Sequence, residues 1–187
     1  MAVRDIIRRK LTYEDYVLIP EDGLRHEILD GEHYMSPAPT PEHQGIAAIL
    51  FRKLDNFVHE RRLGRVYFAP LDIYFSPHDI AQPDLLFISN ERAGIVGKKK
   101  VEGAPDLLVE VLSDSTRRTD QVVKQRIYEA FGVLEYWLVN LQDRTVRVYR
   151  RAGDGFGPAA TLSGEAGDVL TTPLLPGLEI RVGEIFE

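Results

Sequence analysis

A single acidic residue lies inside a strongly apolar segment of this chain. Glu110 interrupts the run Leu-Leu-Val-Glu-Val-Leu at residues 107–112. A short run of this kind, rich in β-branched residues, predicts a strand that is buried on both faces. An unpaired carboxylate in such a strand costs several kcal/mol or shifts its pKa. We therefore expect a divalent metal ion, a lysine or an arginine beside Glu110.

A second acidic residue has a similar setting upstream. Asp84 lies in the segment Gln-Pro-Asp-Leu-Leu-Phe-Ile at residues 82–88, which also predicts a core strand. If the two strands pair, Asp84 lies beside Glu110. Asp106 precedes Glu110 by four residues on one strand, so their Cα atoms are about 13 Å apart. We interpret Asp106 as a strand-entry residue; the alternative for Asp84 is a proline–aspartate turn.

Lys124 is the candidate cation. Asp120, Lys124 and Tyr128 repeat every four residues and share one face of a helix predicted at 119–131. An Asp–Lys pair at this spacing is usually a surface pair worth a few tenths of a kcal/mol. The helix follows the strand of Glu110 closely, however, so its first turns lie near the end of that strand. Two interpretations of Lys124 therefore stay open: a surface partner of Asp120, or a lysine of the site.

Other charged residues give weaker signals. Glu27 precedes a tight turn predicted at Asp30-Gly31, and its local pattern is that of an ordinary hairpin residue. Lys98, Lys99 and Lys100 lie in a predicted loop, where they are either solvated or in contact with phosphates. The chain has no His-x-x-x-His pair, phosphate-binding Gly-rich loop or Gly-x-Ser-x-Gly motif.

Helical and extended patterns alternate along the chain, which predicts an α/β fold with a mixed sheet flanked by helices. Gly64 and Gly132 are the expected stop signals of the two main helices. The predicted elements are a short helix at 12–16, a hairpin at 25–35, a helix from 41 or 42 to 63, strands at 66–75, 80–89 and 107–112, a helix at 119–131, and a hairpin of 135–139 with 145–150.

Length and composition set the remaining bounds. A chain of 187 residues with 44% hydrophobic residues predicts one domain over 1–187, with a core at about 11–150 and an extension of loops and edge strands at about 151–187. The absence of cysteine excludes disulfides, thiolate zinc sites and cysteine nucleophiles. The formal net charge of −6 argues against broad adhesion to nucleic acid, although it permits a local basic groove.

No targeting or membrane segment is expected. Residues 1–10 lack the apolar region of a signal peptide. No apolar stretch approaches the roughly 18 residues of a membrane span. We therefore predict a cytoplasmic protein without a membrane partner.

Several segments together resemble the Uma family of restriction-endonuclease-like proteins, within the PD-(D/E)XK nuclease superfamily. The resemblance runs from about residue 11 to residue 149, with the motifs in the family's order. The matching motifs are HEILDGE at 26–32, SPAP at 36–39, QPDL at 82–85, GAPDLLVEVLS at 103–113, Lys124 with Tyr128, and GVLEYW at 132–137.

The resemblance implies a restriction-endonuclease-like fold, with a central mixed β-sheet flanked by helices on both sides. It implies that Asp84 and Glu110 bind Mg²⁺ (or Mn²⁺), that Lys124 is the catalytic lysine and that Glu27 is an additional acid. The chain departs from the superfamily pattern at Leu112, where the superfamily places a lysine. Lys124 would then supply the ammonium group from the following helix.

The leading functional prediction is a metal-dependent endonuclease that hydrolyses phosphodiester bonds of DNA. Gln82, two residues before Asp84, is expected on the same strand face, and we predict that it and Lys98, Lys99 and Lys100 contact substrate. One alternative is a non-catalytic nucleic-acid-binding or assembly protein that retains the fold; another is a nuclease for RNA or a small nucleotide. A homodimer is expected because two-fold symmetry suits cleavage of both duplex strands.

Overall fold

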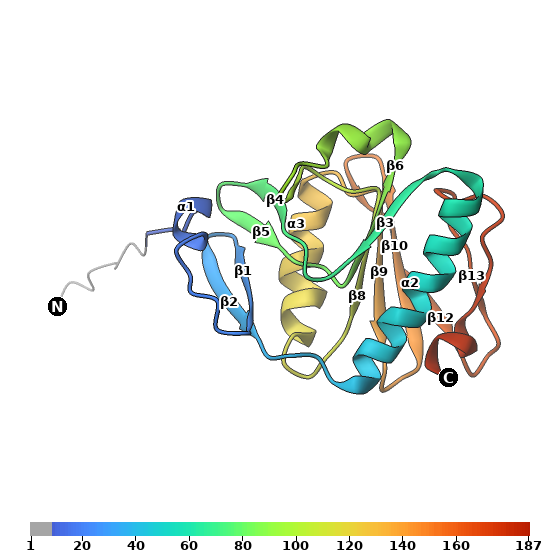
Figure 1. Cartoon of the computed structure of the whole chain (residues 1–187). Helices are drawn as coiled ribbons and strands as arrows, with labels where there is room; N and C mark the ends of the chain where they lie inside the picture. The colour runs from blue at the N-terminus through green and yellow to red at the C-terminus, as the bar shows by residue number, and fades with distance from the viewer. Residues whose placement is uncertain (1–8) are drawn as a thin grey trace.

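The centre of the fold is a mixed β-sheet, seen in Figure 1. The computed structural model describes residues 9–187. The strand order is β11-β10-β9-β8-β6-β3, with β12 paired to β10. The strands of this sheet are β3 (Gly64–Phe68), β6 (Leu85–Ser89), β8 (Leu107–Val111), β9 (Glu135–Asn140), β10 (Thr145–Ala152), β11 (Gly155–Phe156) and β12 (Ala160–Ser163). The helical segments are α1 (Tyr13–Tyr16), α2 (Pro41–Arg61), η1 (Asn90–Ile95), η2 (Thr119–Lys124), α3 (Gln125–Ala130) and η3 (Val182–Phe186).

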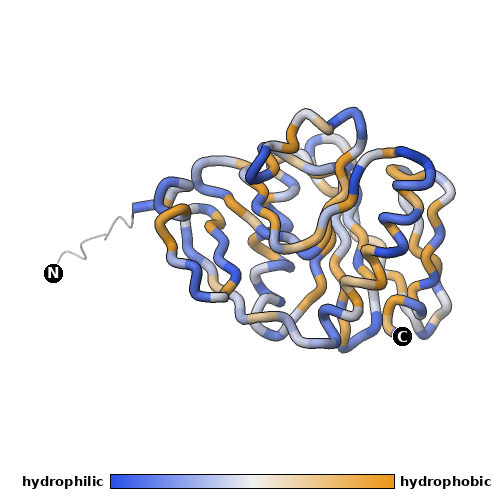
Figure 2. The backbone as a smooth tube through the Cα atoms, in the orientation of Figure 1, coloured by the Kyte–Doolittle hydropathy of each residue, from blue (hydrophilic) through white to orange (hydrophobic). Residues whose placement is uncertain are grey.

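Each face of the central sheet has its own hydrophobic core. Successive side chains of a strand point to opposite faces. On one face, Leu85 and Val109 pack in a core with α2. On the other, Leu86 and Leu108 pack in a core with α3. Helices therefore cover both faces, which confirms the predicted fold class, and Figure 2 shows how hydrophobic the central strands are.

A smaller sheet lies beside the second core, with strand order β2-β1-β5-β4-β7. The predicted hairpin at its edge is confirmed: Asp30 and Gly31 have φ of 54° and 77°, as a tight two-residue turn requires. The predicted short helix is also confirmed as α1, and Thr12 and Asp15 form a capping box at its start. The strands of this sheet are β1 (Arg25–Leu29), β2 (Glu32–Ser36), β4 (Ile73–Ser76), β5 (Asp79–Ala81) and β7 (Val101–Glu102).

The predicted end of the long helix was wrong by two residues. Thr40 caps α2 by accepting a hydrogen bond from the His43 backbone N–H at 3.2 Å. The helix ends at Arg61, and the left-handed residue that follows is Arg62, not a glycine. Gly64 instead begins β3 with φ of 154°, where a Cβ would lie 2.1 Å from the Ile88 carbonyl oxygen. This glycine therefore permits close strand pairing rather than helix termination.

Two predicted strands are each divided between the sheets. The segment 66–75 forms the end of β3 and the start of β4, and 80–89 forms the end of β5 and all of β6. A proline lies in each break, Pro70 in the first and Pro83 in the second. Proline has no N–H to donate and restricts the residue before it, so a continuous ladder is not possible there.

The predicted helix at 119–131 begins as a π-helix. Thr119–Lys124 has the wider π geometry, and α-helical geometry follows over Gln125–Ala130. The wide turns of a π-helix are often found at functional sites, and this one carries Asp120 and Lys124.

The predicted hairpin of β9 and β10 is confirmed.

The C-terminal extension packs on its own chain. Its two short strands, β13 (Val169–Leu170) and β14 (Ile180–Arg181), pair with each other. Its buried apolar residues belong to the same core as α2. These residues are Leu170, Leu175, Leu178, Ile180, Val182 and Ile185. The extension thus completes the core of its own subunit.

Among the described residues, no helix is long and apolar enough to cross a membrane. Residues 1–8, which make up most of the segment expected to lack a signal peptide, lie outside the described part of the chain.

The packing of the extension predicts a large loss of stability when a buried residue of η3 is shortened. The Ile185 side chain is fully buried, so Ile185→Ala should lower the free energy of unfolding by about 2–5 kcal/mol. Val169→Ala is the control, because Val169 is 39% exposed and should change it by less than about 0.5 kcal/mol. Urea unfolding measures both. Equal losses in the two variants would contradict the packing described.

Candidate active site

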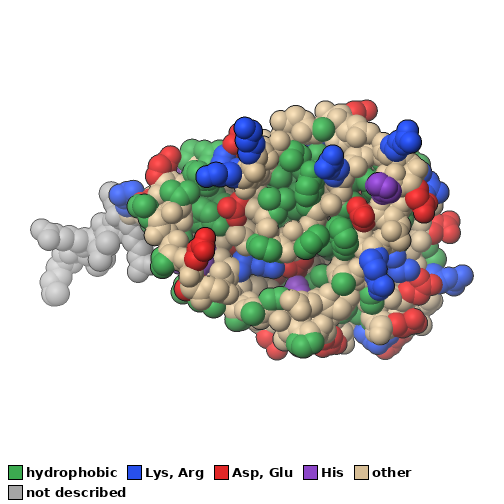
Figure 3. All heavy atoms as spheres, viewed as in Figure 1, with side chains coloured by type: hydrophobic (Ala, Val, Ile, Leu, Met, Phe, Trp, Pro, Cys, Tyr) green, Lys and Arg blue, Asp and Glu red, His purple; other side chains and the backbone are tan. Residues whose placement is uncertain are grey.

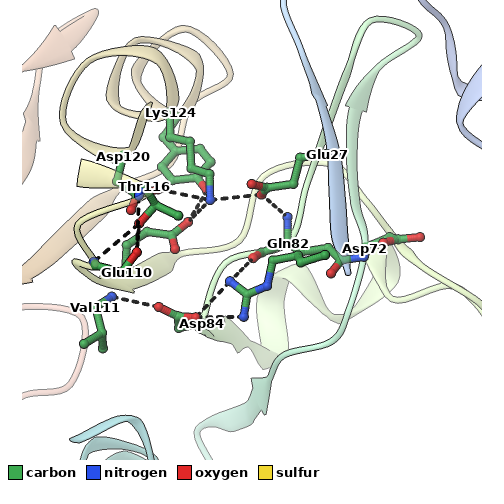
Figure 4. A network of polar contacts seen from close by, with 12 residues as sticks. Glu27, Asp72, Gln82, Asp84, Glu110, Val111, Thr116, Asp120 and Lys124 are labelled. Carbon is green, nitrogen blue, oxygen red and sulfur yellow. Dashed lines mark hydrogen bonds and ion pairs between the residues drawn. The ribbon is translucent and has the colours of Figure 1, made fainter. Parts of the chain in front are cut away.

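Two acidic residues meet at one end of the central sheet (Figure 4). Glu110 lies on β8, on the face of Leu108 that packs toward α3. β6 pairs with β8 so that Leu85 lies opposite Val109. Asp84, one residue before β6, therefore comes beside Glu110. Both side chains are buried, at 4% and 1% exposure.

Lys124 lies at the centre of a buried ion cluster. Its Nζ is 2.9 Å from Glu27 Oε1, 3.0 Å from Glu110 Oε1 and 3.2 Å from Asp120 Oδ1. The side chains of all four residues are at most 3% exposed. The three acids come from β1, β8 and η2, so one ammonium group joins three separate elements.

Further hydrogen bonds fix the orientation of the cluster. The Tyr128 hydroxyl donates to Glu110 Oε1 at 2.8 Å. The Gln82 backbone N–H donates to Glu27 Oε1 at 2.7 Å. Glu110 and Glu27 are thus each held by Lys124 and one further donor. Asp120 Oδ1 is buried and, despite its proximity to Nζ, has no hydrogen-bond donor.

Asp84 belongs to a neighbouring group of polar contacts. Its Oδ1 accepts hydrogen bonds from Arg25 Nη1 and Nη2 at 2.9 and 3.0 Å. Its Oδ2 accepts one from the Val111 backbone N–H at 2.8 Å and lies 3.1 Å from His43 Nε2. Burial opposes ionisation of Asp84, but the contact with His43 and the charge of Arg25 outweigh it and lower its pKa to about 2.

The pKa of Glu110 moves in the opposite direction. Burial raises the pKa of Glu110 well above its ordinary value, and the negative charges of Asp120, Asp84 and Glu27 add to the effect of burial. Lys124 opposes this shift without cancelling it.

The pKa of Lys124 is also shifted. Burial alone would lower the pKa of Lys124, but the surrounding carboxylates raise it well above its ordinary value. The ammonium group therefore stays charged.

Asp84 and Glu110 border one cavity of about 260 Å³. Arg25, His43, Asp120 and Lys124 also line it, together with the loops at 36–40 and 113–116. The space-filling view shows basic, acidic and histidine side chains in a hollow between the N-terminal hairpin and α2 (Figure 3). A small ligand in this cavity would meet three buried carboxylates and two cations.

The structure brings together Asp84, Glu110, Lys124 and Glu27, the four residues predicted as catalytic. The alternative of a surface Asp120–Lys124 pair is wrong, because both side chains are buried. Asp106 has the strand-entry position expected for it, where it accepts a hydrogen bond from the Ser89 backbone N–H at 2.7 Å.

The predicted substrate-contacting residues lie elsewhere. The Gln82 side chain does not share the face of Asp84; its Nε2 donates to Asp72 Oδ1 and to the Tyr16 hydroxyl. Gln82 lies outside β6, because Pro83 interrupts the predicted strand, so strand alternation does not apply. The cavity that Asp84 and Glu110 border is not lined by Lys98, Lys99 or Lys100. Lys100 pairs with Glu102.

Two residues of the site were missed by sequence reasoning. Arg25 precedes Glu27 by two on β1, and this spacing on a predicted hairpin strand would have placed both on one face. His43 lies in the first turn of α2. Nothing in the sequence near His43 signals its contact with Asp84, which depends on how α2 packs on the sheet.

Comparison with known proteins decides the family. A family model described as "Uma2: Putative restriction endonuclease" matches residues 13–183. The chain belongs to the Uma2 family. This confirms the resemblance noted in the sequence, and the match extends into the C-terminal extension.

A solved structure shares the fold. It is described as the "crystal structure of a putative nuclease belonging to DUF820" from Anabaena variabilis ATCC 29413, and its TM-score is 0.80 at 20% sequence identity. The alignment covers 94% of the Uma2 chain described here and 97% of that chain. No curated protein matches.

The charge of the site suits a divalent cation. Four carboxylates (Glu27, Asp84, Glu110 and Asp120) face two permanent cations, Arg25 and Lys124. If all six are ionised, the cluster has a formal charge of −2, counting His43 as neutral. Burial and the neighbouring negative charges together raise the pKa of Glu110.

The residues at the cavity would supply few protein ligands to a metal ion. Among residues 9–187, no group of three or more acidic or histidine side chains forms a ready metal cage. Mg²⁺ commonly uses one or two carboxylates and fills its other positions with water and substrate phosphate. Asp84 and Glu110 both border one cavity and would be the two carboxylates of such a site. Asp84 would exchange a contact with Arg25 or His43 for the ion.

The raised pKa of Glu110 predicts that Glu110→Gln is at least as stable as the parent in chelator at neutral pH. The unfolded chain releases the Glu110 proton near pH 4.5, whereas the folded protein retains it to higher pH. The parent therefore loses stability as pH rises above 4.5, and the variant escapes this loss. Melting temperatures measured from pH 4 to 8 test the expectation.

Mg²⁺ should raise the melting temperature of the parent more than that of Glu110→Gln, because only ligands that bind the native state stabilise it. Glu60→Gln, which removes an exposed acid from α2, should behave as the parent does. Equal Mg²⁺-dependent shifts in the parent and in Glu110→Gln would count against a metal site at Glu110.

Proposed function

We propose that this Uma2 protein is a metal-dependent endonuclease that hydrolyses phosphodiester bonds of DNA. The observation that supports this function best is the meeting of Asp84 and Glu110 at one cavity beside a buried, charged lysine. Membership of the family described as "Putative restriction endonuclease" supports the same class of reaction.

Asp84 and Glu110 would hold Mg²⁺ or Mn²⁺. Asp84 is ionised at any physiological pH, because its pKa is about 2. Glu110 would lose its proton to make room for the ion. Once bound, such an ion stabilises charge on a phosphoryl group and lowers the pKa of its bound water.

Lys124 would act as a fixed positive charge rather than as a base. Its raised pKa keeps it protonated, and all three of its contacts are with carboxylates. It orients Glu110 toward the cavity and offsets part of the negative charge that would otherwise repel a phosphate. A preorganised charge of this kind stabilises the negative charge that develops during phosphoryl transfer.

Arg25 would bind the phosphate. Its guanidinium group lines the same cavity and contacts Asp84 through two N–H groups. Guanidinium groups suit phosphate oxygens because their paired donors match phosphate geometry. An ion at Asp84 would release Arg25 from this carboxylate and leave its donors free for substrate.

A cleavage assay on plasmid, single-stranded DNA and RNA, with and without Mg²⁺ or Mn²⁺, tests the proposal. The parent should cut DNA only with the metal. Asp84→Asn and Glu110→Gln should lose cleavage by a factor of 100 or more, since removing a single charge-stabilising group typically costs about 10²–10³ in rate. Glu60→Gln, at an exposed acid, should cut at the parent's rate.

The same assay separates the alternatives. Cleavage of RNA alone would show a ribonuclease that uses the same site. Metal-independent retention of nucleic acid without cleavage would favour a non-catalytic binding or assembly protein. Full activity in Asp84→Asn would remove this cavity from the mechanism.

A homodimer and a cytoplasmic location stay predictions. The C-terminal extension gives no support to a dimer, because its apolar residues are buried in the core of their own chain. The argument from two-fold symmetry remains. Sedimentation of the full chain at tens of micromolar should show a dimer, and a monomer at that concentration would contradict it; the range is far above the roughly 1 µM of moderate affinities.

A further inference from the structure

A second cavity shares a wall with the candidate active site. Its volume is about 390 Å³, within the range of about 300–1,000 Å³ that is usual for small-ligand sites. Arg25, His43 and Asp84 line both this cavity and the one that holds Glu110. A ligand whose charged part lies at Asp84 would therefore reach the second cavity with an adjacent part.

Apart from Gln44, the rest of the second cavity is apolar and aromatic. Ala47, Phe51 and Phe68 form its wall, between α2 and the end of β3. The ring centroids of Phe51 and Phe68 are 4.9 Å apart at an interplanar angle of 74°. Phe68 is 60% exposed although it is large and apolar. One ring thus supports the other, which keeps a free aromatic face at the cavity.

We propose that this cavity binds one unpaired nucleobase of the strand whose phosphate lies at Asp84 and Arg25. The preferred substrate is then single-stranded or locally unpaired DNA. The inference rests on the proposed function, because the phosphate at the acidic cavity is what brings the neighbouring base to Phe68.

The chemistry of the walls favours a base over other occupants. One wall carries the charge of Arg25 and the other offers an aromatic face, which matches a nucleotide with its anionic phosphate and planar base. Bases of single strands stack on exposed aromatic side chains. The Gln44 amide, also at the wall, offers a donor and an acceptor to the edge of a base. A base inside a duplex is stacked and paired, and it enters such a cavity only by leaving the helix.

Arg25 also lines a third hollow, of about 650 Å³. Three hollows therefore meet at one arginine. A single strand is flexible enough to follow such a path, with its phosphates near Arg25 and one base on Phe68, whereas a duplex is not.

Binding of a fluorescein-labelled 12-nucleotide single-stranded DNA, measured by anisotropy with Mg²⁺, tests the proposal. The full chain keeps Glu110, because Glu110→Gln would remove the proposed metal site, and the strand has non-hydrolysable linkages so that it is not cut. Adding Phe68→Ala should weaken binding about tenfold or more, since stacking of one base contributes about 1–3 kcal/mol. Phe68→Trp should retain the affinity, and binding of the matching duplex should change less than twofold.

Phe131→Ala is the matched control. Phe131 is also partly exposed, at 39%, but packs against Phe75 and does not line the cavity. It should leave single-strand binding unchanged. Melting temperatures of all variants show whether a loss of binding is a loss of fold.

An abasic nucleotide provides a second and more direct arm. A set of oligonucleotides is used in which each lacks the base at a different position of the strand. The protein that retains Phe68 should bind the strand less tightly when one particular position is abasic than when any other is. With Phe68→Ala, intact and abasic strands should bind equally. No difference between intact and abasic strands in the Phe68 protein would overturn the base pocket.

The outcomes distinguish this inference from the proposed function. One outcome is that the parent cuts no substrate while single-strand binding still depends on Phe68. This result would overturn hydrolysis and support the base pocket. Metal-dependent cleavage with unchanged single-strand binding in Phe68→Ala would support hydrolysis and overturn the pocket. A dimer in sedimentation that Phe68→Ala dissociates would overturn it too, because a second chain would then cover the cavity.

Discussion

The structure depends on one buried ammonium group. Lys124 contacts Glu27, Glu110 and Asp120, all of which are as buried as the lysine itself. Removing the cation from a buried ion pair commonly costs about 3–5 kcal/mol, because the acid is left without compensation. Here one cation compensates three acids. The smaller sheet, the central sheet and η2 therefore meet at a point that none of them could form alone.

The topology explains how these elements reach one point. The chain leaves β8 just after Glu110, passes through η2 and α3, and returns as β9 parallel to β8. This crossover places the first turns of the helical segment over the end of β8. The wide turn of the π-helix then accommodates Asp120 and Lys124 together on the side of Glu110. Lys124 thus reaches Glu110 from η2, whereas Leu112 packs in the core on the α3 side of the sheet.

Much of the site was predictable because strands impose strict geometry. Glu110 stood out as a carboxylate in an apolar strand, and strand pairing placed Asp84 beside it. The same logic failed for Gln82, because Pro83 ends the strand pattern before Asp84. His43 was not predictable, since its contact with Asp84 depends on the packing of α2 and not on any local spacing. Local pattern is therefore informative about strand neighbours and uninformative about contacts between layers.

The opposite pKa shifts of Asp84 and Glu110 give the two acids different parts in one site. Arg25 and His43 keep Asp84 ionised, so its charge is permanent. Burial, and after it the negative charges of Asp120, Asp84 and Glu27, raise the pKa of Glu110 despite the contact with Lys124 and so favour its protonated form. A divalent ion in the cavity would replace that proton. Ion binding and proton release would then be coupled, so the affinity for the metal should rise with pH as long as Glu110 remains the group that titrates.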